Sequence, residues 1–348
     1  MIIVSLRIRT VIGLILLAFC IVCRFCLPAA DFYAVRLYPV ISGTASFIAS
    51  AFPFSLEEFV VLGFVAALVA IVVKAVRCRQ KFAAWAHRIL MWVVWVLVWF
   101  YMGWGNNYYR TGLYERNAIN RARFDEAAFK TFLDNFTEQL NAEAAAAGDY
   151  DPQELEAEAR AFYCDQASRY GYCALKRWQH VKSPVFNRLF SAVAIAGYMG
   201  PFFCESQVNR DLPPVEYPYV AAHELAHLAG VTSEAEASYW GFAFCRQSGN
   251  SAVRYSGFLS LYPYVISHAR AFLTEEEYRL WSASVCDKAK EDLRAARERS
   301  AALQVEWIEK IQRWMQNLLL TSNGVRGGIT DYYGVVSIVM TMDAAGQP

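Results

Sequence analysis

Three apolar segments in the first 105 residues constrain the fold of this chain more than any other feature. They cover about residues 11–27, 59–76 and 89–105. Each approaches the roughly 20 residues that an α-helix needs to cross a bilayer. Hydrophobic residues make up 56% of the chain and charged residues 19%, which is apolar for a soluble protein. We therefore expect three transmembrane helices in a multi-pass protein of the cell membrane.

The connection between the first two segments carries one basic residue, Arg36, and its residues 39–54 are apolar, which indicates an interfacial or re-entrant piece. Basic residues instead precede the first segment and flank the loop between the second and third: Arg7, Arg9, Lys74, Arg77, Arg79, Lys81 and Arg88. Since cytoplasmic loops carry the excess of positive charge, these two regions are expected in the cytoplasm. Residues 1–105 then form an uncleaved membrane anchor, and residues 106–348 a domain outside the cytoplasm.

Charge and cysteine content exclude some functions and leave others open. The net charge is +1, and there is no basic stripe, phosphate-binding loop or RNA-binding motif, so we expect no nucleic-acid partner. Nine cysteines are present, and Cys164 and Cys173 are near enough in sequence to pair outside the cytoplasm. Cysteines that are merely small buried hydrophobic residues are an equally good interpretation.

Residues 220–238 read VAAHELAHLAGVTSEAEAS and hold His223 and His227 four positions apart, with Glu224 between them. Residues at i and i+4 lie on one face of a helix, so two imidazoles placed in this way can bind one Zn²⁺. Glu224, about 100° round the helix, can then act as general base on a water in the open coordination position. The alternative is a structural helix, but it would bury a glutamate and two imidazoles without a metal.

A zinc site needs a third protein ligand, and two glutamates compete for this role. A second helix is expected to start near Ser233, which places Glu236 at the third helical position of a capping box. Glu236 would then be engaged by backbone N–H groups, so we favour Glu234 as the third ligand. The alternative for both residues is an acidic helix N-terminus that complements the helix dipole.

HELAH followed by a helix carrying E-A-E-A-S resembles the gluzincins, zinc peptidases with two His from one helix and a Glu from the next. Membrane gluzincins similar to the prenyl-protein endopeptidases carry E-x-x-x-D on that second helix. Glu234 matches the Glu of that pattern, whereas Ser238 stands where the Asp would be. The metzincin pattern fails, because its third His would fall at Ser233.

The chain is also similar, over nearly its whole length, to a bacterial family of multi-pass membrane proteins of unknown function with a zincin motif. HELAH is one of the shared motifs, and the others are found at Trp104–Arg110 (WGNNYYR), Gly197–Asn209, Arg254–Leu259 (RYSGFL) and Asn323–Val336 (NG…GG…DYYGVV). This resemblance implies a fold and a metal, but no substrate.

Between the motifs, the sequence predicts helices at about 121–147, 152–169 and 183–196. Residues 197–211 are rich in aromatic residues and Gly, which suggests strands or an extended loop that could bind a substrate backbone by strand addition. Within this segment, Glu205 and Asn209 either contact substrate or form a turn that bonds its own backbone.

Two later segments complete the expectations. Tyr255 is our candidate for stabilising an oxyanion, although packing against the motif helices explains it equally well. Residues 274–320 are charged and helical; a membrane-contacting amphipathic helix is possible there, but the mixed charges favour a solvated face.

Together these features predict a mainly α fold, with transmembrane helices followed by a zincin-like, mostly helical domain with a small strand element. The predicted function is a membrane-anchored zinc metallopeptidase that hydrolyses peptide bonds with a Zn²⁺-activated water and Glu224 as general base. Its ligands would be His223, His227 and Glu234, and its partners a peptide or protein substrate and the lipid bilayer. The alternatives are a non-enzymatic membrane scaffold or receptor with a structural metal site and, less favoured, a cell-wall amidase. The oligomeric state stays open.

Overall fold

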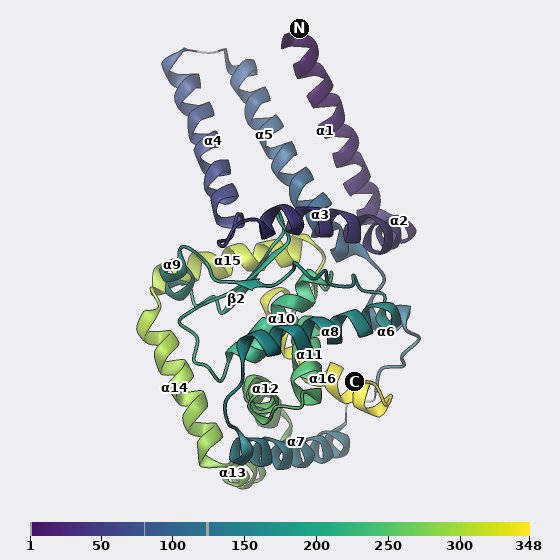
Figure 1. The fold of residues 1–348 in the computed structure, drawn as a ribbon, viewed down its shortest axis with the longest axis vertical. Helices are drawn as coiled ribbons and strands as arrows, with labels where there is room; N and C mark the ends of the chain where they lie inside the picture. Colours follow the sequence, from purple (N-terminus) through teal and green to yellow (C-terminus); the bar gives the residue numbers. More distant parts are fainter. Residues whose placement is uncertain (1, 80, 123–124) are drawn as a thin grey trace.

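Three long helices stand on a larger helical domain (Figure 1). The structure is a computed structural model that describes residues 2–79, 81–122 and 125–348, with side chains described from residue 8 onward. The long helices are α1 (Ile2–Phe25), α4 (Glu57–Arg77) and α5 (Phe82–Gly103). All three are long and apolar enough to cross a membrane, which confirms the three predicted segments. α5 begins earlier than expected because alanine-rich residues extend it toward its N-terminus.

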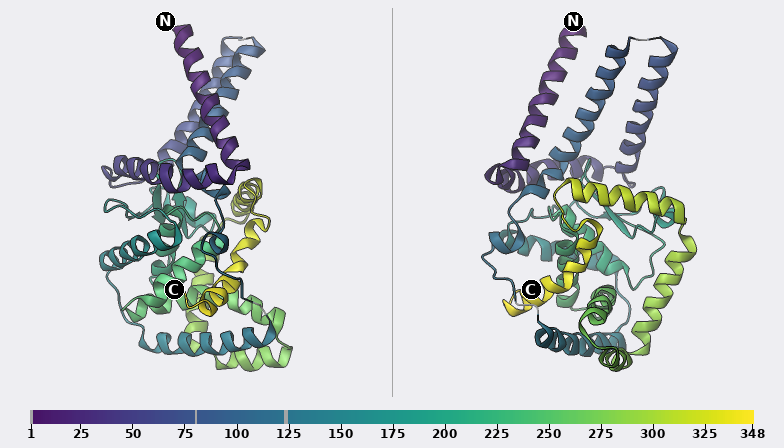
Figure 2. Two further views of the ribbon diagram at one scale, coloured as in Figure 1. Left: turned by 90° about the vertical axis from the view of Figure 1, so that its right-hand side faces the viewer. Right: turned by 180° about the vertical axis from the view of Figure 1, so that it is seen from behind.

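A chain of short helices lies across the ends of these spans, nearly perpendicular to them (Figures 1 and 2). It consists of α2 (Leu27–Phe32), η1 (Tyr33–Leu37) and α3 (Tyr38–Ser50). Tyr33 donates a hydrogen bond to the carbonyl of Met102 at 2.8 Å, and Tyr38 donates to the carbonyl of Leu228 at 2.7 Å. This segment therefore joins the spans to the domain beneath them. The division at residue 105 stays a prediction.

The domain below the spans is built from helices packed around a central one, α10 (Tyr217–Leu228). Its other helical elements are η2 (Gly105–Tyr109), α6 (Leu113–Arg116), α7 (Glu126–Ala146), α8 (Pro152–Tyr170), α9 (Asn187–Ala192), α11 (Glu234–Gln247), α12 (Ser251–Phe272), α13 (Glu275–Ser284), α14 (Asp287–Leu303), α15 (Glu306–Ser322), η3 (Gly328–Gly334) and α16 (Val335–Ala344). α8, α11 and α12 pack directly on α10, which accounts for its almost complete burial. The fold is mainly helical, as predicted.

Two of the predicted helices have different limits in the structure. α7 begins at Glu126 because the side chain of Asp125 accepts a hydrogen bond from the backbone N–H of Ala128 at 2.9 Å, and Arg123 and Phe124 lie outside the described residues. The helix expected at 183–196 is reduced to the short α9. Ala194 has a left-handed backbone with φ 55°, which ends the helix before the first long strand.

A small three-stranded sheet covers one side of α10. It has the order β1 (Val181–Lys182), β3 (Glu205–Val208), β2 (Gly197–Gly200), with β1 parallel and β2 antiparallel to the central β3. The hydroxyl of Ser206 in β3 donates to the carbonyl of Glu224 at 3.0 Å, which ties the sheet to α10. β2 is an edge strand of this sheet.

The sequence left open whether Glu205 and Asn209 contact a substrate or hold the local structure. In the structure both side chains bond to other parts of the chain. The carboxylate of Glu205 accepts hydrogen bonds from the backbone N–H groups of Leu56 (2.8 Å) and Glu57 (3.1 Å), where α4 begins. Lys182 neutralises it at 2.7 Å, so that the buried carboxylate anchors a span to the sheet. The side-chain oxygen of Asn209 accepts from the backbone N–H of Asp211 at 2.9 Å, as expected for a residue that holds its own turn, and its amide N–H groups bond Ser191 and the carbonyl of Ile195.

All nine cysteines lie within the described residues, and each has a free thiol. Cys164 and Cys173 are therefore not paired; the thiol of Cys164 lies 3.3 Å from the carbonyl oxygen of Leu175. Four others, Cys20, Cys23, Cys204 and Cys245, are buried, in accord with the interpretation as small hydrophobic residues.

Candidate metal centre

α10 carries the histidine pair at the centre of the domain. Pro218 lies in its first turn, where a missing N–H leaves no bond unmade, and the chain leaves through Gly230 with φ 96°. His223, Glu224 and His227 retain only 8%, 4% and 6% of their accessible surface. The motif thus lies on a buried helix.

α11 begins beside α10 and supplies a carboxylate. Its N-cap is Ser233, which accepts a hydrogen bond from the backbone N–H of Glu236 at 3.2 Å. The two helices approach closely at Gly241, because a Cβ there would lie 3.2 Å from the backbone nitrogen of His223. This close packing brings Glu234, in the first turn of α11, to the histidine pair.

The three side chains converge on one point. The Nε2 atoms of His223 and His227 are 3.1 Å apart, and Oε2 of Glu234 lies 3.4 Å from the first and 3.3 Å from the second. Ligand atoms ~2.0–2.1 Å from a tetrahedral zinc lie about 3.3–3.4 Å from one another. The cluster therefore has the spacing of three corners of a zinc tetrahedron.

The other ring nitrogens have partners that orient the imidazoles. Nδ1 of His227 lies 2.8 Å from the carbonyl oxygen of Val231, a contact that orients the ring and points Nε2 toward the cluster. Nδ1 of His223 lies 3.4 Å from the hydroxyl of Ser238. Ser238 thus contacts the histidine from the position at which the membrane gluzincins carry an aspartate. Trp104 donates from its indole to the carbonyl of His227 at 2.9 Å, which fixes α10 from the end of α5.

Burial and mutual contact shift the pKa values of the cluster. Burial lowers the pKa of His223, with a smaller effect from His227. Burial also disfavours the charged form of His227, but the Glu234 carboxylate outweighs it and raises the pKa of His227 to about 9. Burial acts against the charged form of Glu234, yet the two imidazoles hold its pKa well below the usual range. The ionised Glu234 carboxylate is therefore stabilised by its contact with the two imidazoles.

Oε2 of Glu224, a buried oxygen of the site, lacks a hydrogen-bond partner among the described residues, whereas Oε2 of Glu234 faces the two imidazoles at 3.3 and 3.4 Å. A buried polar atom left unpaired costs about 1–3 kcal/mol, so such atoms in a folded protein call for a ligand or a water. Two imidazole nitrogens and one carboxylate oxygen are also the donor set that zinc takes in catalytic sites with an open position. His223, His227 and Glu234 could therefore hold a zinc ion.

The carboxylate of Glu224 lies against the edge strand β2. A Cβ at Gly197 would lie 2.5 Å from Oε1 and 2.6 Å from Cγ of Glu224. Only glycine at this position leaves room for the carboxylate in its present place. Burial raises the pKa of Glu224 to about 8, as expected for a carboxyl in an apolar setting.

We expect the Gly197→Ala substitution to displace the Glu224 carboxylate while leaving the three candidate ligands in place. If the site is catalytic, turnover should fall by at least about tenfold, because a general base must lie within hydrogen-bond reach of the proton it takes. Metal content, measured by elemental analysis, should stay unchanged. Gly148→Ala is the matched control, since a Cβ there meets nothing within 4 Å. Equal turnover of the two variants would contradict this role of Gly197.

The structure places Tyr255 away from the cluster and Tyr332 beside it. The Tyr255 hydroxyl donates to the Asp292 carboxylate on α14 at 2.7 Å. The Tyr332 ring lies parallel to that of His223, with centroids 6.5 Å apart, and burial and Glu234 raise the pKa of its hydroxyl well above the usual range. Asp331 holds this segment by accepting from the hydroxyl of Ser233 at 2.9 Å. The DYYG motif of the C-terminal region is the sequence signal that could have pointed to Tyr332.

The competing glutamate, Glu236, is engaged elsewhere. Its Oε1 accepts from Arg116 at 2.7 Å and from the hydroxyl of Tyr172. The sequence argument for Glu234 assumed a capping box, but the carboxylate of Glu236 is occupied by these side chains instead. Of the two glutamates, the structure brings Glu234 to the histidines.

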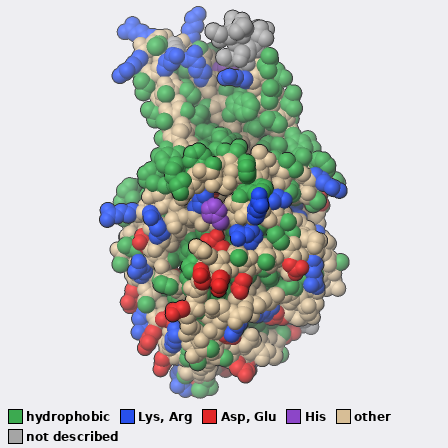
Figure 3. All heavy atoms as spheres, viewed as in Figure 1, with side chains coloured by type: hydrophobic (Ala, Val, Ile, Leu, Met, Phe, Trp, Pro, Cys, Tyr) green, Lys and Arg blue, Asp and Glu red, His purple; other side chains and the backbone are tan. Residues whose placement is uncertain are grey.

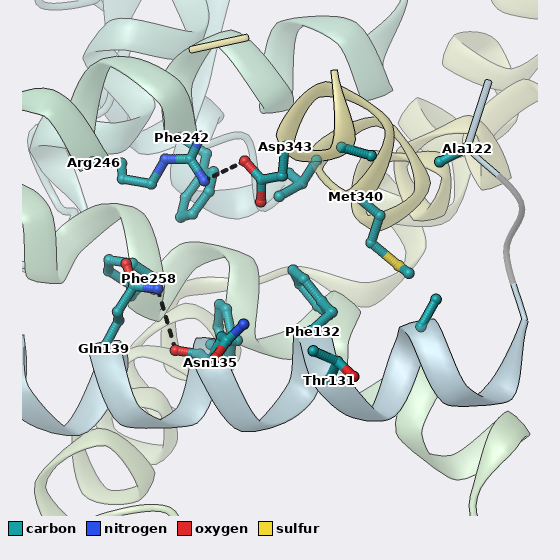
Figure 4. A pocket seen from close by; sticks show the side chains of 14 residues that line it. Ala122, Thr131, Phe132, Asn135, Gln139, Phe242, Arg246, Phe258, Met340 and Asp343 are labelled. Carbon is teal, nitrogen blue, oxygen red and sulfur yellow. Dashed lines mark hydrogen bonds and ion pairs between the residues drawn. The ribbon is translucent and has the colours of Figure 1, made fainter. Parts of the chain in front are cut away.

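Among the described residues, two hollows of the helical domain are considered as substrate sites. A cleft of about 580 Å³ is lined in part by Tyr264, by Ala196 before β2, and by Tyr219, whose ring centroid lies 6.2 Å from that of His223. A second hollow of about 460 Å³ lies between α7, α11, α12 and α16 (Figure 4), where an ion pair between Arg246 and Asp343 crosses its wall. None of His223, Glu224, His227 and Glu234 lines either hollow, but the first reaches the neighbourhood of the cluster through Tyr219, so it is the candidate substrate cleft.

The model of the family described as protein of unknown function (DUF3810) matches residues 33–340. The chain belongs to this family. No curated protein matches the chain. No solved structure matches it either. The DUF3810 match runs from the short helices under the spans to α16, so it includes α4, α5 and the whole candidate metal centre. The expected membership of a family of unknown function is confirmed.

Proposed function

We propose that this chain is a membrane-anchored zinc metallopeptidase, a zincin-like hydrolase. The observation that carries the proposal is the convergence of His223, His227 and Glu234 with tetrahedral spacing at a buried point, next to a buried Glu224. Zinc, when bound by these residues, supplies a Lewis acid that polarises a carbonyl and lowers the pKa of water. This combination of metal ligands and adjacent carboxylate is that of an H-E-x-x-H hydrolase.

The residues of the chain would divide the remaining work among them. Glu224 takes a proton from the attacking water and passes it to the leaving amine, because its buried Oε2 has no hydrogen-bond partner among the described residues. Tyr332, beside His223 and Glu234, is placed to donate a hydrogen bond to the developing oxyanion, the role first assigned to Tyr255. The edge strand β2 offers its free side to an extended peptide, and the adjoining cleft receives side chains.

The catalytic domain is proposed to lie outside the cytoplasm. Figure 3 shows lysine and arginine side chains gathered at the ends of the spans that point away from the outer domain. Lys74 and Arg77 lie in the last turn of α4 and Arg79 in the turn that follows it, whereas the side chain of Arg7 lies outside the described part. Since the basic ends of spans face the cytoplasm, the outer domain faces the other side.

Removal of metal tests the proposal directly. The purified full-length chain in nanodiscs should cleave members of a peptide library, lose this activity on chelation, and regain it with stoichiometric Zn²⁺ but not with Mg²⁺. Cleavage of peptidoglycan fragments alone would favour an amidase that uses the same site. A zinc-loaded chain that cleaves neither class would contradict the proposal and favour the membrane scaffold or receptor.

A further inference from the structure

α15 has its apolar face turned away from the protein. Five large hydrophobic side chains on it are half or more exposed: Trp307 66%, Ile311 50%, Trp314 65%, Met315 59% and Leu318 52%. These positions follow the i, i+4, i+7, i+8, i+11 spacing of one helix face. Ion pairs of Lys310 with Glu306 at 2.6 Å and of Arg313 with Glu309 at 3.3 Å gather the charges on a separate face.

The side of α15 that contacts the protein is the more polar one. Gln312 and Gln316 lie on it, where the amide of Gln312 bonds the side chain of Gln316 and the amide of Gln316 donates to the hydroxyl of Tyr332 at 3.3 Å. A surface helix of a soluble protein shows the opposite arrangement, with its apolar stripe toward the core. α15 is therefore arranged for an outer medium that is itself apolar. The mixed charges, which favoured a solvated face in the sequence, are confined to one side of the helix.

The position of α15 indicates what this medium is. In Figures 1 and 2 it runs across the end of the outer domain that faces the spans, nearly perpendicular to them and close to the level of α3. The short helix α9 lies beside it, preceded by exposed Val185 and Phe186 and carrying exposed Leu189. Figure 3 shows hydrophobic side chains continuing from the spans onto the upper end of the outer domain. The apolar surface of the spans is thus continuous with the level at which α15 lies.

We propose that α15 is an interfacial helix that lies in the surface of the bilayer crossed by α1, α4 and α5. Trp307, Ile311, Trp314, Met315 and Leu318 enter the boundary between headgroups and acyl chains, to a depth of about 5–10 Å. The paired charges of the helix stay at the headgroups. Lipid is the occupant because the spans place a bilayer at this end of the molecule, whereas the other faces of the outer domain lie farther from it.

This contact would fix the candidate site relative to the membrane. α15 packs on η3, which carries Asp331 and Tyr332, and Asp331 binds the N-terminus of α11. A bilayer-bound α15 therefore holds the tyrosine and the metal cluster at a constant distance from the lipid surface. The membrane contact of α15 would set the position of the metal cluster whether or not that cluster is catalytic.

Quenching by brominated lipid tests the proposal in the full-length chain. Wild type and a Trp307→Phe/Trp314→Phe variant are placed in nanodiscs with and without phosphatidylcholine brominated on its acyl chains. The span tryptophans are quenched in both proteins, so their contribution cancels. The difference between the wild-type and variant spectra is the emission of Trp307 and Trp314. We expect brominated lipid to quench this emission, because both indoles lie in the lipid boundary.

Trp281→Phe is the matched control, because α13 lies at the end of the outer domain opposite the spans (Figure 1). The emission of Trp281, obtained as the difference between wild type and this variant, should not be quenched by the brominated lipid. Should the emission of Trp307 and Trp314 be unquenched, the proposal is overturned. In that case the number of chains in each nanodisc decides what covers the apolar face of α15. One chain would mean that this face meets water, and two chains would mean that it is a protein interface. Since both indoles are about two-thirds exposed, phenylalanine there leaves the fold intact, which circular dichroism checks.

Discussion

The His227→Ala substitution is expected to lower bound zinc from about one ion per chain to near zero in protein purified with zinc present. It removes one of three ligands, whereas a catalytic zinc site needs three ligands from the protein. The substitution also frees the carbonyl of Val231, which now faces Nδ1 of His227. Elemental analysis of folded protein, normalised to chain concentration, measures the effect.

The same variant should lose stabilisation by metal. A ligand present at about 100 times its Kd, and bound only by the folded state, stabilises by about 2.7 kcal/mol. Addition of zinc should therefore raise the melting temperature of the wild type but not that of His227→Ala. A variant that is folded and still binds one zinc with unchanged affinity would exclude His227 as a ligand.

A matched glutamate pair identifies the third ligand. Glu234→Gln should reduce zinc binding strongly, because the amide replaces the charged oxygen that faces both imidazoles. Glu236→Gln should leave zinc content unchanged, because that carboxylate pairs with Arg116 and Tyr172 and an amide can still accept their hydrogen bonds. The reverse pattern would assign the ligand role to Glu236.

The local part of the site could be predicted from the sequence, because it depends on helix geometry alone. His223, Glu224 and His227 lie within two turns of one helix, and their relation follows from its period. The choice of Glu234 rested on an assumed capping box, whereas the carboxylate of Glu236 is held by Arg116. A local pattern led to the residue that the structure brings to the histidines, but the partner that engages the other glutamate is distant in sequence.

Features that depend on tertiary contacts could not be derived in this way. Tyr332 reaches the cluster only because Asp331 binds the start of α11, a contact between segments far apart in the chain. Similarly, the sequence of α15 shows two faces but does not show which of them the protein covers. Tyr255 was a reasonable candidate by its proximity to the motif in sequence, yet its hydroxyl faces α14. Periodicity thus predicts the faces of helices, and packing decides where each face points.

The Glu224→Gln substitution is expected to separate metal binding from chemistry. Glutamine keeps the size and shape of the side chain beside Gly197, and Glu224 is not among the three converging ligands, so zinc content should match the wild type. The amide cannot take a proton from water, and loss of general acid–base catalysis should lower kcat by about 10²–10⁴-fold. KM should change little, because substrate contacts through β2 and the cleft remain.

The comparison with Gly197→Ala makes this prediction specific to proton transfer. Both substitutions act on the carboxylate of Glu224: Glu224→Gln removes its basicity, and Gly197→Ala moves it. Both variants should therefore retain zinc and have a lower kcat. A shared loss with normal zinc content points to the carboxylate itself as the reacting group. Full peptide hydrolysis by Glu224→Gln with zinc bound would refute the general-base role. In a scaffold or receptor neither variant would have a functional effect, whereas loss of His223 or His227 would destabilise the outer domain.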